Sequence, residues 1–280
     1  MRYSDMHTHG DYSDGRGSFK KFMESAREKG IVSLGFSDHS PVPIDNGWSM
    51  KKESLPGYLS DLESVKQKSS GGPEIYAGLE LDYIPGINVK EYIGFDGLPL
   101  DYFLGSVHYV YSDKQGEYFT VDGSFESFDY LVKKGFEGNG KAVFKAYYNN
   151  VREMIASYVP AVIAHIDLVT KNNRRGIYFD TGSDEYKNEI EKTLDIVKLY
   201  GSIVEINTGG MSRGYMDKPY PSEYILYKCL EKGIPVAMNS DAHSPDALAY
   251  GFENVLTLIK AIGFNEIITY QNGTWTPRQL

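Results

Sequence analysis

The chain has 280 residues with 29 basic and 38 acidic side chains, so its formal charge is −9. An apolar fraction of 41% over this length closes a sizeable core, which excludes disorder and fits either one large domain or a pair of small ones. Because no linker rich in Pro, Gly or Ser divides the chain, we predict one domain over residues 1–280. The acidic balance argues against broad binding of DNA or RNA, which draws on clustered Lys and Arg. No apolar run reaches the roughly 18–20 residues of a membrane helix, no cleaved leader is expected, and Cys229 is a lone cysteine. These features predict a soluble cytoplasmic protein.

Short apolar runs alternate with amphipathic segments, which is the pattern of strands alternating with helices. Strands are predicted within residues 1–10, 31–39, 74–84, 101–110, 161–169, 202–207 and 234–243. Helices are predicted at residues 19–30, 55–68, 141–157, 184–200, 222–232 and 252–262, followed by a short last strand at 267–270.

Seven strand candidates separated by helices favour one barrel-like α/β domain. Periodicity alone does not separate such a barrel from an open doubly wound sheet. Residues 111–140 are rich in Gly, Asp and aromatic side chains, and they are predicted to form a long loop with one helix of its own. Because long insertions in compact domains tend to carry function, this loop is a candidate lid.

All six histidines lie at or just beyond the ends of predicted strands, and none lies on a predicted helix. In a parallel barrel the carboxyl ends of all strands open on one face, so residues far apart in the sequence converge there. The six residues are His7, His9, His39, His108, His165 and His243. The sequence therefore predicts a cluster of histidines at one end of the strands.

The spacing of these residues and of nearby carboxylates indicates a metal site. His7 and His9 form a His-x-His pair whose imidazoles point to one side of a strand, and Asp241 and His243 repeat that spacing. Glu80 is a lone carboxylate in an apolar strand, where burial is costly without a paired charge or a cation. Each residue alone also fits an ordinary core role. Carboxylates and imidazoles without thiolate indicate Zn, Mn or Fe, with Mg also compatible.

The whole motif set resembles the polymerase and histidinol phosphatase (PHP) superfamily. The motifs are HTH at residues 7–9, SDH at 37–39, GLELD at 78–82, the single histidines His108 and His165, and SDAH at 240–243. Within the superfamily the chain is most similar to bacterial histidinol-phosphate phosphatases, through stretches between residue 4 and about residue 253. The resemblance implies a distorted seven-stranded, TIM-like barrel that holds two to three divalent ions.

When the metal ligands of the superfamily are carried over motif by motif, the resemblance implies nine ligands in this chain, with Glu80 bridging two ions. These ligands are His7, His9, Asp14, His39, Glu80, His108, His165, Asp241 and His243. The resemblance also implies that the protein hydrolyses L-histidinol phosphate to L-histidinol and phosphate in histidine biosynthesis, through a hydroxide that bridges two ions. The partner is then a small phosphorylated metabolite, without nucleic acid or membrane.

Other residues are candidates for handling the phosphate group. Arg213 and Lys171 follow predicted strands and could bind phosphate, although each also fits a solvated loop cation. Arg213 is in addition a candidate catalytic residue, and Asp241 is a candidate to pass a proton to the leaving group.

Two other functions stay open at this point. Because substrate choice lies in loops and not in metal ligands, another phosphoesterase of the same superfamily fits the same motifs, acting on a different small phosphorylated metabolite or nucleotide. A non-catalytic, metal-stabilised scaffold is the remaining alternative, and the complete ligand set argues against it.

Overall fold

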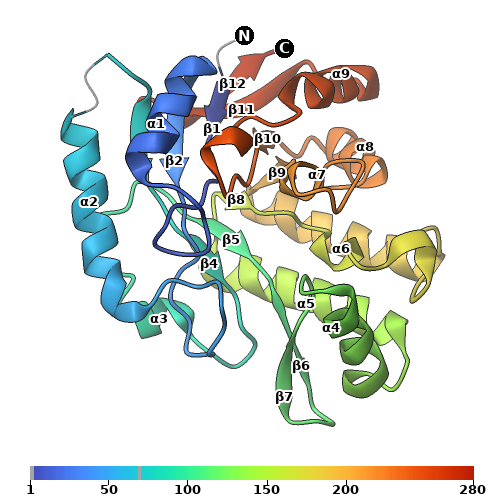
Figure 1. Cartoon of the computed structure of the whole chain (residues 1–280). Coiled ribbons are helices and arrows are strands. Elements are labelled where there is room, and N and C mark those ends of the chain that lie inside the picture. The colour runs from blue at the N-terminus through green and yellow to red at the C-terminus, as the bar shows by residue number, and fades with distance from the viewer. Residues whose placement is uncertain (1–2, 69–70) are drawn as a thin grey trace.

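Parallel strands occupy the middle of the molecule, with helices around them (Figure 1). The computed structural model describes residues 3–68 and 71–280. One sheet has the strand order β1-β2-β3, and a second has the order β12-β11-β10-β9-β8-β5-β4. The strands are β1 (Tyr3–Asp5), β2 (Ile31–Phe36), β3 (Glu74–Ala77), β4 (Glu80–Asp82), β5 (Leu104–Ser106), β6 (Tyr109–Ser112), β7 (Glu117–Thr120), β8 (Val162–Ile163), β9 (Ile203–Asn207), β10 (Val236–Asn239), β11 (Glu266–Gln271) and β12 (Thr274–Gln279). The β6–β7 and β11–β12 pairs are antiparallel, and the other strand pairs are parallel.

The six predicted helices are confirmed within two residues at each end. The helices are α1 (Phe19–Glu28), α2 (Leu55–Lys68), α3 (Val89–Ile93), α4 (Phe125–Tyr130), α5 (Gly140–Tyr158), α6 (Asp184–Tyr200), α7 (Gly209–Ser212), α8 (Glu223–Lys232) and α9 (Phe252–Ile262). Helix α6 shows why helix boundaries could be predicted from the sequence. The Ser183 side chain accepts the Tyr186 N–H at the start of the helix, and Gly201 adopts φ 70° at its end. None of the helices in the described part of the chain is long and apolar enough to cross a membrane.

The two larger sheets meet through single bridges at the ends of their strands. Thr8, which follows β1, pairs with Ala242, which follows β10. On the other side, His39 beyond β2 pairs with Glu80 of β4. These two bridges join segments that carry predicted ligands, so the junctions between the sheets are also where the site is built.

A tyrosine ring fills the space between two of the central strands. The Tyr102 hydroxyl donates to the Met6 carbonyl oxygen at 2.7 Å, and the ring passes over Gly35 and Gly78. A Cβ atom at either glycine would overlap this ring. Close approach of the strands therefore requires glycine at both positions.

Gly78 also explains where the sequence prediction for the third strand was wrong. The segment 74–84 is two strands rather than one: β3 pairs with β2, whereas β4 pairs with β5 in the other sheet. The chain changes sheets at Gly78 and Leu79. Glu80 therefore begins β4 instead of ending a strand.

Residues 111–140 also differ from the predicted long loop. They contain most of the β6–β7 hairpin, α4 and a π-helical turn (Leu131–Gly135), and the hairpin projects away from the sheets in Figure 1. Cross-strand contact between Tyr111 and Tyr118, with ring centroids 5.0 Å apart, stabilises the hairpin. The sequence prediction missed this hairpin and the last strand, β12. The role of the segment as a lid stays a prediction.

Candidate metal centre

All nine predicted metal ligands come together where the two sheets join. Four overlapping groups of side chains have ligand atoms within 4.8 Å of one another. The groups are His9, Asp14, His39 and His243; His7, Glu80 and His165; His7, His9 and Asp241; and His39, Glu80 and His108. Sequence separations of more than 230 residues are thus reduced to a few ångströms, as expected for strand ends that share one face.

Glu80 lies at the centre of the cluster and is 1% exposed. Its two carboxylate oxygens face five imidazoles. The distances are 2.9 Å to His39 Nδ1, 2.9 Å to His165 Nε2, 3.3 Å to His7 Nε2, and 3.6 Å to both His9 Nε2 and His108 Nε2. One carboxylate shared by so many imidazoles is suited to bridging two cations.

The outer part of the cluster depends on a short loop after β1. Asp14 Oδ1 lies 3.3 Å from His243 Nε2 and 3.8 Å from His39 Nε2. The buried carboxylate of Asp38 holds the loop by accepting the N–H groups of Gly10 at 3.1 Å and Ser13 at 2.9 Å. These bonds place Asp14 against the two histidines.

The electrostatics of the cluster favour ionised carboxylates. Burial would raise the pKa of Glu80, but the charges of His39, His7 and His108 hold it well below its usual value. Burial would also raise the pKa of Asp241, but the charges of Arg213 and His7 hold it well below the usual range. Both carboxylates are therefore ionised, which is the state in which a carboxylate binds a metal ion.

Several nitrogen and oxygen atoms in the cluster are sealed from water and make no well-directed hydrogen bond within the described residues, although ligand atoms of neighbouring side chains lie as close as 2.9 Å. They are His7 Nε2, His9 Nδ1, His9 Nε2, Asp14 Oδ1, His39 Nδ1, Glu80 Oε2 and His165 Nδ1. Buried polar atoms without partners are rare in proteins, and a bound ion is one accepted reason for them. The residues present therefore fit divalent metal ions.

Two buried carboxylates orient the predicted ligands from behind, and sequence reasoning missed both. Glu205 Oε1 lies 2.7 Å from His7 Nδ1, and Asp82 Oδ1 lies 2.6 Å from His108 Nδ1. Carboxylates in this position fix the ring orientation and raise the basicity of the other nitrogen. The argument applied to Glu80, a carboxylate in an apolar strand, would have found both residues.

Backbone strain marks the same region. His165 has φ 24° and Asp241 has φ 49°, values in the left-handed half of conformational space that residues with a side chain seldom adopt. Such strain persists only where the surrounding structure imposes it, and it is concentrated at functional sites.

The two predicted phosphate-binding cations line a pocket of about 220 Å³ that opens over the cluster. We call it the strand-end pocket. Arg213 Nη2 lies 3.0 Å from Asp241 Oδ2, and Arg213 Nη1 lies 2.7 Å from His243 Nδ1. The Lys171 ammonium bonds to the Asp122 carbonyl oxygen and lies 4.5 Å from the centroid of the Tyr215 ring. Burial lowers the pKa of Lys171.

Fold and site together define an α/β protein with a candidate multinuclear metal centre at the carboxyl ends of its strands. The PHP domain model matches residues 5–209, and the chain belongs to this family.

Relatives of known description extend over most of the chain. A probable histidinol-phosphatase of Deinococcus radiodurans is 28% identical over 266 residues, with 93% of each chain covered. The histidinol-phosphatase of Bacillus subtilis is 26% identical, covering 91% of this chain and 99% of its own. The histidinol phosphate phosphatase of Lactococcus lactis, solved with zinc, L-histidinol and phosphate, has the same fold: its TM-score is 0.73 at 22% identity, over 97% of this chain and 98% of that one.

Proposed function

We propose that this protein is a metal-dependent phosphomonoesterase that hydrolyses L-histidinol phosphate to L-histidinol and phosphate in histidine biosynthesis. The cluster of nine candidate ligands around Glu80 carries the proposal, because its sealed, unpartnered atoms fit metal ions. The substrate comes from the similarity to histidinol-phosphatases over at least nine-tenths of the chain.

We assign the cluster two to three divalent ions, Zn, Mn, Fe or Mg. His7, His9, Glu80 and Asp241 would hold the first ion, Glu80 with His108 and His165 the second, and Asp14, His39 and His243 the third. Bound ions supply positive charge for the phosphoryl group and water activated near neutral pH. Glu205 and Asp82 keep the rings of His7 and His108 in the orientation that exposes the opposite nitrogen.

The cationic side chains would bind and orient the phosphate. Arg213 offers a planar donor fork at the mouth of the cluster, and Gly209 beside it leaves room for the guanidinium because a Cβ there would crowd Arg213 and Asp241. Lys171 adds a second positive charge at the wall of the strand-end pocket. Asp241 is the group that we assign to proton transfer to the leaving oxygen; because it is ionised, it would first take up the proton that the attacking water loses. An Asp241→Asn protein that retained its metals and full turnover would contradict that role.

The carbon part of the substrate carries an ammonium group and an imidazole, and the strand-end pocket offers partners for both. Among the carboxylates that the described residues bring to this pocket, Asp122 is the one that is not a predicted ligand. Its position is fixed because the Asp122 carbonyl oxygen accepts Lys171 and the Gly123 carbonyl oxygen accepts Asn172 Nδ2 at 3.0 Å. Trp48 lines the same pocket. Asp122 would hold the ammonium group, and Trp48 would contact the imidazole.

The metal-loaded protein should hydrolyse L-histidinol phosphate with a kcat/KM far above that for p-nitrophenyl phosphate and other phosphomonoesters, and a chelator should abolish both activities. Comparable rates across unrelated phosphates would reject this substrate and leave a phosphatase of the family with another one. No turnover of any phosphate after metal loading would favour a scaffold.

The Asp122→Asn variant tests recognition of the substrate separately from chemistry. We expect kcat/KM for L-histidinol phosphate to fall by about tenfold or more, because a charge-assisted hydrogen bond is lost, while p-nitrophenyl phosphate is hydrolysed as before. An equal loss on both substrates would mean that Asp122 supports the metal centre instead.

The finer features of the architecture are also proposals. We propose one domain over residues 1–280 whose strands form a distorted seven-stranded barrel, supported by the bridges Thr8–Ala242 and His39–Glu80 between the sheets. A cytoplasmic location and the absence of a nucleic-acid partner stay predictions from composition.

A further inference from the structure

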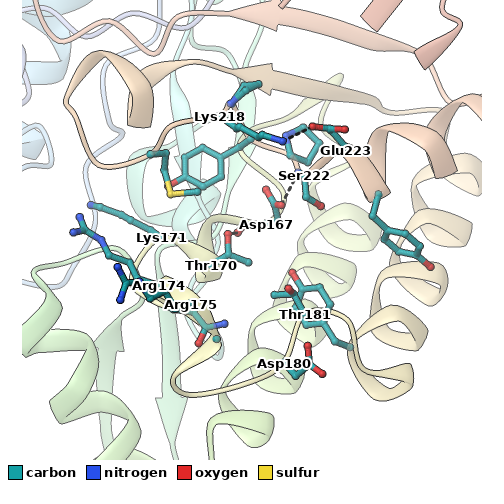
Figure 2. Close-up of a pocket in the computed structure, with 18 of the residues that line it drawn as sticks. Asp167, Thr170, Lys171, Arg174, Arg175, Asp180, Thr181, Lys218, Ser222 and Glu223 are labelled. Carbon is teal, nitrogen blue, oxygen red and sulfur yellow. Dashed lines mark hydrogen bonds and ion pairs between the residues drawn. The ribbon is translucent and has the colours of Figure 1, made fainter. Parts of the chain in front are cut away.

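A second cavity lies beside the strand-end pocket, and none of the nine predicted ligands lines it. It has a volume of about 670 Å³ and opens between residues 167–181, after β8, and residues 216–224, at the start of α8 (Figure 2). We call it the flanking pocket. Lys171 and Tyr220 line both pockets, so the two share a wall.

One side of the flanking pocket is cationic. Figure 2 shows Arg174 and Arg175 together with Lys171 on this side. Within residues 3–68 and 71–280, neither guanidinium has an ion pair or a hydrogen bond. Lys218, on another wall, is already paired with Glu223 at 2.6 Å. The two adjacent guanidinium groups are therefore available to an anionic group, which their donor forks suit.

The loop that presents these arginines is held in place. The buried Asn173 side chain accepts the N–H groups of Tyr178 at 3.0 Å and Phe179 at 3.2 Å, and its amide donates to the Phe179 carbonyl oxygen at 2.7 Å. Between these bonds Arg175 adopts φ 57°, ψ 20°, a left-handed conformation that is uncommon for arginine. A loop fixed in this way loses little further freedom when a ligand binds.

The inner part of the flanking pocket offers acceptors. Asp167 is 2% exposed; its Oδ2 accepts the Ser222 N–H at 2.8 Å, and its Oδ1 makes no hydrogen bond within the described residues. The hydroxyl of Tyr220, which is 3% exposed, also has no partner there. Figure 2 places Asp167 in the middle of the pocket, between Ser222 and Thr170. An unpaired buried carboxylate oxygen is costly and would be stabilised by a donor with positive charge.

We propose that the flanking pocket binds a small zwitterion, with its anionic group on Arg174 and Arg175 and its ammonium group directed to Asp167. A simple anion would place its charge near the Asp167 carboxylate, and a simple cation would leave both guanidinium groups unpaired. Free amino acids and phosphorylated amines share the required chemistry. The proposal holds whichever phosphate ester the strand-end pocket hydrolyses.

Calorimetric titration of the metal-loaded full chain, with the strand-end pocket saturated by inorganic phosphate, tests this site. The probes are 4-aminobutyrate, 3-aminopropylphosphonate, and the singly charged butylamine and butyrate. We expect at least one zwitterion to bind about tenfold more tightly than either singly charged probe, since one more charged contact is made. Preference for the carboxylate indicates an amino acid, and preference for the phosphonate indicates a phosphorylated amine.

Variants then locate the binding. Arg174→Gln and Asp167→Asn should each weaken the zwitterion by about tenfold. Lys20→Gln, which removes an exposed positive charge on α1, should leave it unchanged. Melting curves that match the parent exclude loss of fold. Binding no tighter than butyrate or butylamine, or equal binding by parent and variants, would overturn the proposal.

Discussion

The strand-end cluster and the α5–α6 helix pair are both buried, but they are built in opposite ways. In the cluster, ionisable side chains crowd around Glu80, and several of their polar atoms have no hydrogen bond within the described residues. Between α5 and α6 the contacts are mostly apolar, and the polar groups are paired, as in the 2.8 Å bond between the Tyr148 and Tyr186 hydroxyls.

This difference separates two tasks within one fold. Burying charge without satisfying every partner costs stability, so the cluster is a place where stability is given up for chemistry. Apolar packing with satisfied hydrogen bonds supplies the stability that the cluster lacks. Substitutions in the two regions should therefore change different measured quantities.

The largest expected effect comes from Glu80→Gln. Removing the central charge should lower kcat/KM by more than about 100-fold, the upper range for losing a group that only supports a ligand. Metal content after dialysis, measured by mass spectrometry, should fall in parallel. Glu53→Gln, on the exposed 3-10 turn before α2, is the matched control. A Glu80→Gln protein with full metal content and full activity would contradict the proposed centre.

Leu194→Ala probes the other region. Leu194 is fully buried on α6, so truncation should lower the free energy of unfolding by about 2–5 kcal/mol through lost burial and a cavity. Urea denaturation measures the loss. Leu199→Ala, at a position 75% exposed on the same helix, should change stability little. The contrast between regions would fail if Leu194→Ala altered KM or metal content at a temperature where the variant is folded.

Glu205→Gln tests whether the cluster extends to the side chains behind it. Loss of the charge at His7 Nδ1 should lower metal affinity or activity by about 10–100-fold. Competition with a chelator dye gives the affinity, and Glu185→Gln on the surface of α6 serves as the control. Unchanged metal affinity and activity would mean that only the side chains that contact the metal directly are needed.

The smallest effect is expected from substitution of Glu189. This side chain forms ion pairs with Arg152 at 2.9 Å and with Lys192 at 3.0 Å. Burial would raise the pKa of Glu189, but Lys192 and Arg152 hold it below its usual value. The ion pairs therefore stabilise the folded protein at pH values above 4.5, the ordinary pKa of a glutamate. This stabilisation is lost as the pH falls through the lower pKa that Glu189 has in the folded protein.

Glu189→Gln should accordingly cost about 1 kcal/mol at pH 7. The pair with the half-exposed Lys192 is screened by solvent, so most of this loss comes from the less exposed Arg152, which loses a partner charge. The difference in melting temperature from the parent should shrink as the pH is lowered below 4.5. A difference that is constant with pH would assign the effect to packing instead of charge.

The elements that the sequence predicted well are those with local signals. Helix α6 has a serine cap and a terminal glycine, and its bounds were predicted to the residue. The β6–β7 hairpin was missed although its signal is local, since two strand-like runs flank the four-residue DKQG turn. The split between β3 and β4 depends on the Tyr102 ring over Gly78, which is a long-range effect.

The spacing of two in His-x-His and Asp-x-His fixes the direction of four candidate ligands within a few residues, whereas the full set of nine was implied by the resemblance to the PHP superfamily. Glu205 and Asp82 are also carboxylates in apolar strands and could have been included by the same argument as Glu80, but their role behind His7 and His108 follows only from contacts across the fold. Arg213 was placed correctly at the strand ends, but its bonds to Asp241 and His243 could come only from three-dimensional coordinates.

The ring of Tyr102 has a consequence for how this chain can change over evolutionary time. Because the ring occupies the space that a Cβ would need at Gly35 and at Gly78, alanine at Gly78 is compatible with the fold only if residue 102 becomes smaller, and alanine at Gly35 only if the end of Met6 moves as well. The three positions, far apart in the sequence, should therefore vary together among related chains. An alignment deep enough to measure covariation would show them as a coupled set, distinct from the metal ligands.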